Sequence, residues 1–116
     1  MRTLPFVAAG QEWAMPANFA TLQSVAERVG DPFDLLMRWG TLQAGEAALT
    51  AMQTVDTLCI GLQAAGCKAT RAELANELLE RGLLSLSDTA AGFITLLATA
   101  ATGEPAPEAG AKKKTK

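Results

Sequence analysis

Apolar and polar positions alternate over a short distance at the start of the chain and then follow a helical period through most of the remainder. Two short runs that contain apolar residues, 4–7 and 12–15, are separated by four residues that include Gly10. Glycine adopts the positive φ angles that tight hairpin turns need. The pattern therefore predicts a short β-hairpin within residues 1–17, and its two prolines restrict both strands to edge pairing.

Two helices are predicted next. Asn18 is a suitable N-cap for the first helix, and Gly30 ends it in the left-handed cap position. Asp31 and Pro32 begin the second, because aspartate caps well and the missing N–H of proline costs nothing in a first turn. The expected inward face of the first helix is Phe19, Leu22, Ala26 and Val29. The expected inward face of the second is Phe33, Leu36, Met37 and Gly40. Whether the second helix continues through Ala44–Met52 stays open.

Three further helices follow the same signals. The third begins around Thr54 and ends at Gly66, and Val55, Leu58, Cys59 and Leu62 form its apolar stripe. Thr70 and Glu73 match a reciprocal capping box for the fourth helix, which ends at Gly82. Ser85 or Ser87 opens the fifth. The apolar face of that last helix is Leu86, Ala90, Phe93, Ile94 and Leu97.

The predicted fold is mainly α: a compact bundle of about five short helices preceded by a short N-terminal β-hairpin. A chain of 116 residues suffices for one modest core, and we expect a single helical domain over residues 1–102. Residues 103–116 are rich in Pro, Ala and Lys, a composition typical of a disordered tail. Alanine favours helices, but its methyl group buries little area, so the core is expected to be thin.

Charge is distributed unevenly. Four lysines lie in the last five residues, while residues 1–111 hold six Lys and Arg against all twelve Asp and Glu, a net charge of −6. An acidic body argues against specific nucleic-acid binding. Residues 1–7 are too short for a signal peptide, and the charge-free stretch 89–103 is shorter than the roughly 20 residues that cross a bilayer. We therefore expect a cytoplasmic protein without a membrane partner.

The sequence contains no organised set of catalytic groups. There is no histidine, which removes the commonest general base and the commonest metal ligand. Cys59 lies in an apolar stripe, Cys67 follows a glycine, and their spacing matches no zinc motif, so both are interpreted as structural thiols. Acidic residues such as Glu77 are interpreted as solvated helix charges. We expect no enzyme activity, no cofactor and no metal.

Several segments together resemble the small tail proteins of gene transfer agents and related siphophages. The segments are residues 19–30, Asp31-Pro-Phe-Asp-Leu-Leu-Met-Arg38, residues 54–66 with their Gly-Leu-Gln-Ala-Ala-Gly ending, and Thr70-Arg-Ala-Glu-Leu-Ala75. The resemblance covers roughly residues 4–101 and depends on the order and spacing of the set. Ala44–Met52 is longer than the connection expected for the family, and the lysine-rich tail departs from its pattern.

The resemblance implies a role in tail morphogenesis and leaves the exact role open. We expect an assembly chaperone that binds the tape-measure protein and keeps it soluble. A structural protein associated with the tail tube or connector, contacting the tube protein, is the alternative within the family. A small helix-turn-helix DNA-binding regulator, built from residues 66–82 and the helix before them, is a further alternative. The sequence leaves the oligomeric state open. The candidate partner-binding residues are Phe33, Met37, Trp39, Phe93 and Leu97; Trp39 is included because it lies off the main stripe of its helix.

Overall fold

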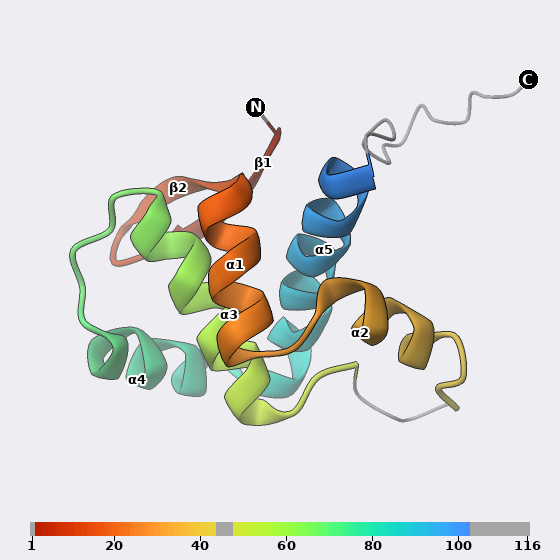
Figure 1. The fold of residues 1–116 in the computed structure, drawn as a ribbon. Coiled ribbons are helices and arrows are strands. Elements are labelled where there is room, and N and C mark those ends of the chain that lie inside the picture. Colours follow the sequence, from red (N-terminus) through yellow and green to blue (C-terminus); the bar gives the residue numbers. More distant parts are fainter. Residues whose placement is uncertain (1, 44–47, 103–116) are drawn as a thin grey trace, which may run out of the picture.

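The computed structural model describes residues 2–43 and 48–102, and within them it shows a β-hairpin followed by five helices (Figure 1). This confirms the predicted mainly α fold. The predicted tail over residues 103–116 lies outside the described residues. The elements are β1 (Arg2–Ala8), β2 (Gln11–Ala17), α1 (Phe19–Arg28), α2 (Pro32–Trp39), α3 (Ala51–Ala64), α4 (Arg71–Arg81) and α5 (Leu83–Thr102).

The hairpin pairs β1 with β2 in antiparallel register, with Phe6 opposite Trp13. Its turn is formed by Ala9 and Gly10, whose φ angles are 51° and 80°. Two consecutive positive φ angles are typical of a type I′ turn, which matches the twist of the flanking strands. Alternate side chains point inward, and those of Phe6 and Met15 are buried against the helices.

Capping side chains fix where the helices begin. Asn18 and Thr21 form a reciprocal capping box at α1, and Thr70 and Glu73 form the predicted one at α4. A third box, which we did not predict, joins Thr50 to Gln53 and starts α3 at Ala51 rather than near Thr54. Of the segment whose helicity was open, residues 44–47 lie outside the described residues, residues 48–50 are not helical, and residues 51–52 open α3. The last helix begins at Leu83, ahead of both serines.

The core is built around α3 and α5, which lie side by side through the centre of the fold, with the other elements around them (Figure 1). All five side chains predicted for the inward face of α5 are buried. The hairpin packs on α3 where Met15 lies over Gly61. The missing side chain at Gly61 allows Met15 to pack directly on the backbone of α3.

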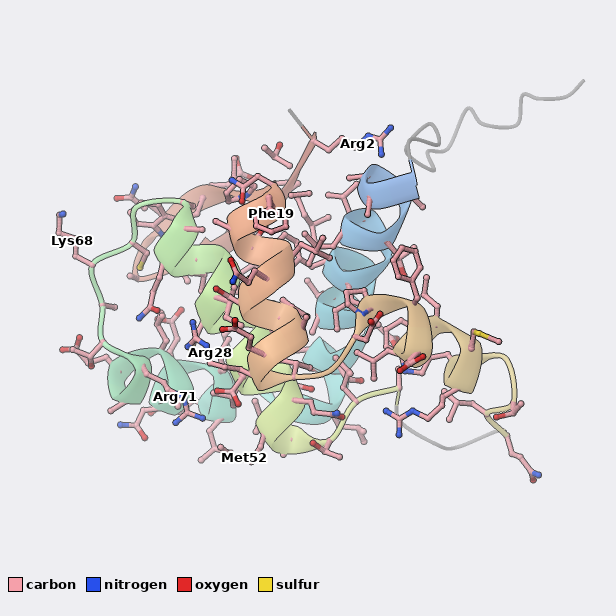
Figure 2. All side chains as sticks on the ribbon, viewed as in Figure 1. Arg2, Phe19, Arg28, Met52, Lys68 and Arg71 are labelled. Carbon is pink, nitrogen blue, oxygen red and sulfur yellow. The ribbon has the colours of Figure 1, made fainter. Side chains whose placement is uncertain are left out.

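The predicted inward faces of α1 and α2 are wrong in part. Phe19 is 74% exposed on α1 (Figure 2), while Thr21 is buried and its hydroxyl donates a hydrogen bond to the carbonyl oxygen of Pro16. On α2, Leu35 is buried, whereas Phe33 and Met37 are exposed. Apolar side chains occur on both sides of this short helix, and its packing against α5 decides which side is buried. For α1 and α2, periodicity therefore identified the helix without identifying which side faces the core, whereas for α3 and α5 it identified both.

The sequence estimate of the last apolar stretch was too short. α5 has 20 residues, because the helix also includes residues 83–88, which precede the charge-free stretch and end in Asp88. By length and composition alone, its segment Leu83–Ala101 is long and apolar enough to cross a membrane. In this fold the side chains along one side of that segment form the centre of the protein core.

The hairpin is also tied to α4 by polar contacts. The carboxylate of Glu77 accepts hydrogen bonds from the backbone N–H of Ala9, at 3.1 and 3.2 Å. Arg81 donates to the carbonyl oxygen of Val7, and its guanidinium carbon lies 4.7 Å from the centre of the Phe6 ring. Glu77 is thus a contact between distant segments, which corrects its interpretation as a solvated helix charge.

Candidate functional site

The outer side of α2 carries the exposed apolar residues that the sequence put forward as partner contacts. Met37 is 77% exposed and Phe33 is 43% exposed, one helical turn before it. Exposed apolar side chains that lie together mark interaction sites more often than isolated ones. We call Phe33 and Met37, with the exposed charged residues Asp34 and Arg38 beside them, the α2 surface.

Local sequence holds this surface in position. Asp31 caps the helix by accepting a hydrogen bond from the backbone N–H of Phe33, at 2.8 Å. Pro32 occupies the first turn and is buried, and Leu35 points the opposite way into the core and is 2% exposed. Because Pro32 and Leu35 anchor one side of α2, Phe33 and Met37 are directed outward.

A shallow hollow lies beside the α2 surface. Its volume is about 520 Å³, and it is lined by the end of α1, the α1–α2 turn and one side of α2. The side chains of Asp34, Met37 and Arg38 all line it. A small apolar group flanked by charges of both signs would fit there, which suits the edge of a protein contact better than a small-molecule pocket.

Trp39 has a structural role and not the partner-binding role that its position in the sequence suggested. The indole is partly buried against the core, and its Nε1 donates a hydrogen bond to the carbonyl oxygen of Ala48 at 2.7 Å. This hydrogen bond joins Ala48, in the segment before α3, to the end of α2. Trp39 was expected to lie off the core stripe; it packs inward, and we assign it a structural part.

Phe93 and Leu97 are 0% and 2% exposed. Both lie on the side of α5 that forms the core, so a partner reaches them only if the domain opens. Their inclusion among the surface residues is corrected for that reason. Of the five candidates, the structure brings Phe33 and Met37 together at the surface.

Other large apolar residues are exposed elsewhere in the described part of the chain, and two of them, Phe19 and Leu84, border a groove or hollow. Phe19 borders a groove of about 380 Å³ between the start of α1 and the end of α5, where Leu22 and Ala100 also contribute. At the opposite end of the fold, Leu84 is 74% exposed and lines a small apolar hollow of about 260 Å³ beside Ala51. Neither place carries paired charges of opposite sign such as those on α2.

Metal-ligating side chains do not cluster in the part of the chain that the structure describes, and both cysteines there are buried. Over residues 2–43 and 48–102, no three His, Cys, Asp or Glu side chains come together as a metal site would require. Cys59 and Cys67 are both buried free thiols. Burial raises the pKa of the Cys59 thiol to about 11, so at neutral pH it is protonated and a poor nucleophile.

Comparison with known proteins adds no relative: no protein-family model, no curated protein and no solved structure matches this chain.

Proposed function

We propose that this chain is a non-catalytic tail assembly chaperone whose α2 surface binds an apolar helical segment of a tape-measure protein. The observation that carries the proposal is the outward exposure of Phe33 and Met37 on a helix whose other side is anchored in the core. The sequence resemblance described above supplies the biological setting.

The physical basis of such a function is the protection of apolar stripes. A tape-measure protein is a long helical chain, and its apolar stripes are open to aggregation until tube subunits surround it. A helix with i and i+4 apolar side chains can pack on such a stripe. Methionine suits this task because its flexible, polarisable side chain adapts to different partners.

Contacts on α4 favour this function over a DNA-binding one. In a helix-turn-helix arrangement α4 would enter the major groove, and its arginines would contact DNA. Arg71 instead pairs with Asp56 at 2.6 Å, and Arg81 is held by the hairpin. The remaining exposed charges along α4 include Glu73 and Glu80, which repel phosphates.

The test is co-expression with the tape-measure protein of the same locus, using two matched variants. Met37→Lys and Leu79→Lys each replace an exposed apolar residue at the third-last position of a helix, one on α2 and one on α4. Lysine suits both positions, because it lies near the negative end of the helix dipole. Both variants should therefore fold, with unfolding free energies within about 0.5 kcal/mol of the parent.

We expect the parent and Leu79→Lys to keep the tape-measure protein soluble and to copurify with it, and Met37→Lys to lose both effects. Equal activity of the two variants would remove α2 from the interface. If the parent leaves the tape-measure protein insoluble and instead forms rings, alone or with tube subunits, the chain is a structural tail component and the chaperone proposal is wrong.

A further inference from the structure

The charges on the α2 surface are arranged so that the surface is complementary to itself. Asp34 and Arg38 are exposed and one helical turn apart, and both lie on the same flank of the stripe formed by Phe33 and Met37. Neither forms an ion pair with another of the described residues. One flank of the stripe thus carries an acid and a base that have no partner within this part of the chain.

Two copies of α2 that pack face to face and antiparallel would pair these charges. Positions 34 and 38 are equidistant from Leu36, so a two-fold axis passing beside Leu36 places Asp34 of each copy opposite Arg38 of the other. Such an axis passes between the two helices and is perpendicular to the plane that contains them. It therefore keeps the two charged flanks on the same side of the interface. A parallel arrangement would put those flanks on opposite sides, so the complementarity selects the antiparallel one.

We propose that two copies of this chain associate through antiparallel contact of their α2 surfaces, with two reciprocal Asp34–Arg38 ion pairs beside an apolar centre. Near the axis, Met37 of one copy contacts Met37 of the other. The Phe33 side chain of each copy lies farther from the axis, at one end of the contact. One short helix buries less than the roughly 800 Å² per partner of a standard interface, so the association is weak and depends on concentration.

The biological role that we assign to this dimer rests on the proposed function. A protein that exposes an apolar stripe needs to cover it when no client is present. Self-association covers Phe33 and Met37 in the free protein, and a tape-measure helix competes for the same side chains. The dimer is then a reserve form that releases binding-competent monomers as client appears, because the weak contact dissociates readily.

Charge reversal tests the pairing directly. Asp34→Arg makes both flanking positions basic, and Arg38→Asp makes both acidic. Sedimentation velocity over a concentration series should show the parent self-associating, and each variant alone should do so more than about tenfold more weakly, because like charges then face each other. An equimolar mixture of the two variants should associate again, since each acidic flank then meets a basic one.

The mixture distinguishes ion pairs between two copies from effects of the substitutions on the stability of α2 itself. Both substitutions oppose the helix dipole, so neither variant should associate better for reasons of helix stability. Association of the mixture should weaken at high salt. The proposal is overturned if the parent stays monomeric throughout the series, if either variant alone associates like the parent, or if the mixture of folded variants stays monomeric.

The two proposals fail separately. If association follows the charge pattern but the tape-measure protein stays insoluble, the dimer stands and the chaperone function is wrong. If the parent solubilises the tape-measure protein but shows no association, the function stands and the α2 pairing is wrong.

Discussion

Substituting Gly61 by alanine probes how the hairpin is seated on the central helix. Gly61 is buried in the last turn of α3, where the side chain of Met15 crosses it. A Cβ atom added at Gly61 would lie 2.6 Å from Sδ of Met15 and 3.1 Å from its Cβ and Cγ. Carbon atoms in good contact are about 3.5–4.0 Å apart, so all three approaches are too close.

Two effects of opposite sign decide the outcome. Alanine is favoured over glycine inside a helix by about 1 kcal/mol. Overpacking a core with one methyl group costs about 1–3 kcal/mol. The sulfur of Met15 can turn away, but its Cβ is fixed by the β2 backbone, so the strand itself must move. We therefore expect Gly61→Ala to lower the free energy of unfolding by up to about 2 kcal/mol in total.

Gly92 provides the matched control. It is exposed in α5, and a Cβ added there meets no atom within 4 Å. In urea unfolding followed by circular dichroism, Gly92→Ala should raise the unfolding free energy by up to about 1 kcal/mol. In a Met15→Ala background, Gly61→Ala should lose its penalty or become stabilising. Equal stabilisation by the two glycine substitutions in the parent would refute the close packing of the hairpin on α3.

Three other predictions follow from single contacts. The buried hydroxyl of Thr57 has no hydrogen-bond partner among the described residues, so Thr57→Val should raise the unfolding free energy by about 1 kcal/mol in thermal melts, and a lowered stability would contradict this. Glu77→Ala should cost about 0.5–1.5 kcal/mol and speed hydrogen exchange at the Ala9 amide, whereas Glu80→Ala should leave that exchange rate unchanged. Burial raises the pKa of Cys59 from 9.0 to about 11. The folded state therefore holds the thiol proton more tightly than the unfolded state, and this contribution to stability, complete below pH 9, is lost as the pH rises toward 11. The stability difference between the parent and Cys59→Ala should shift against the parent over that range, and a constant difference would count against the raised pKa.

Local signals in the sequence predicted most of the elements. Asn18, Asp31 and Thr70 each accept a hydrogen bond from a first-turn amide, as their positions suggested. Gly30 and Gly82 adopt the positive φ angles expected at helix ends. These features depend on neighbours a few residues away, so the sequence alone carries the information. The start of α3 was missed although Thr50 and Gln53 carry the signal of a capping box.

The orientation of α1 and α2 could not be predicted in the same way. α2 has apolar residues around most of its circumference, so periodicity does not select between Leu35 and Met37 as the inward side chain. That choice depends on how α2 packs on α5, which involves residues some sixty positions away. The burial of Thr21 in α1 depends likewise on a carbonyl group supplied by the hairpin.

The sequence identified two apolar residues of the candidate site but did not show whether they are exposed. Phe33 and Met37 were identified because they are large apolar residues on one helix, but their exposure became known only from the fold. The pair Asp34 and Arg38 was overlooked as a feature of the surface. An acid followed four residues later by a base is visible in the sequence, and it would have indicated a charged flank.

The attachment of the hairpin to α4 has a consequence for the order in which the chain folds. The contacts of Glu77 with Ala9 and of Arg81 with Val7 join residues 68 and 74 positions apart. The hairpin therefore cannot complete these contacts until Arg81, which follows Val7 by 74 positions, has been synthesised. Isolated two-stranded hairpins are marginally stable in water. The hairpin is thus synthesised well before α4, and it lacks these two native contacts until α4 has followed it.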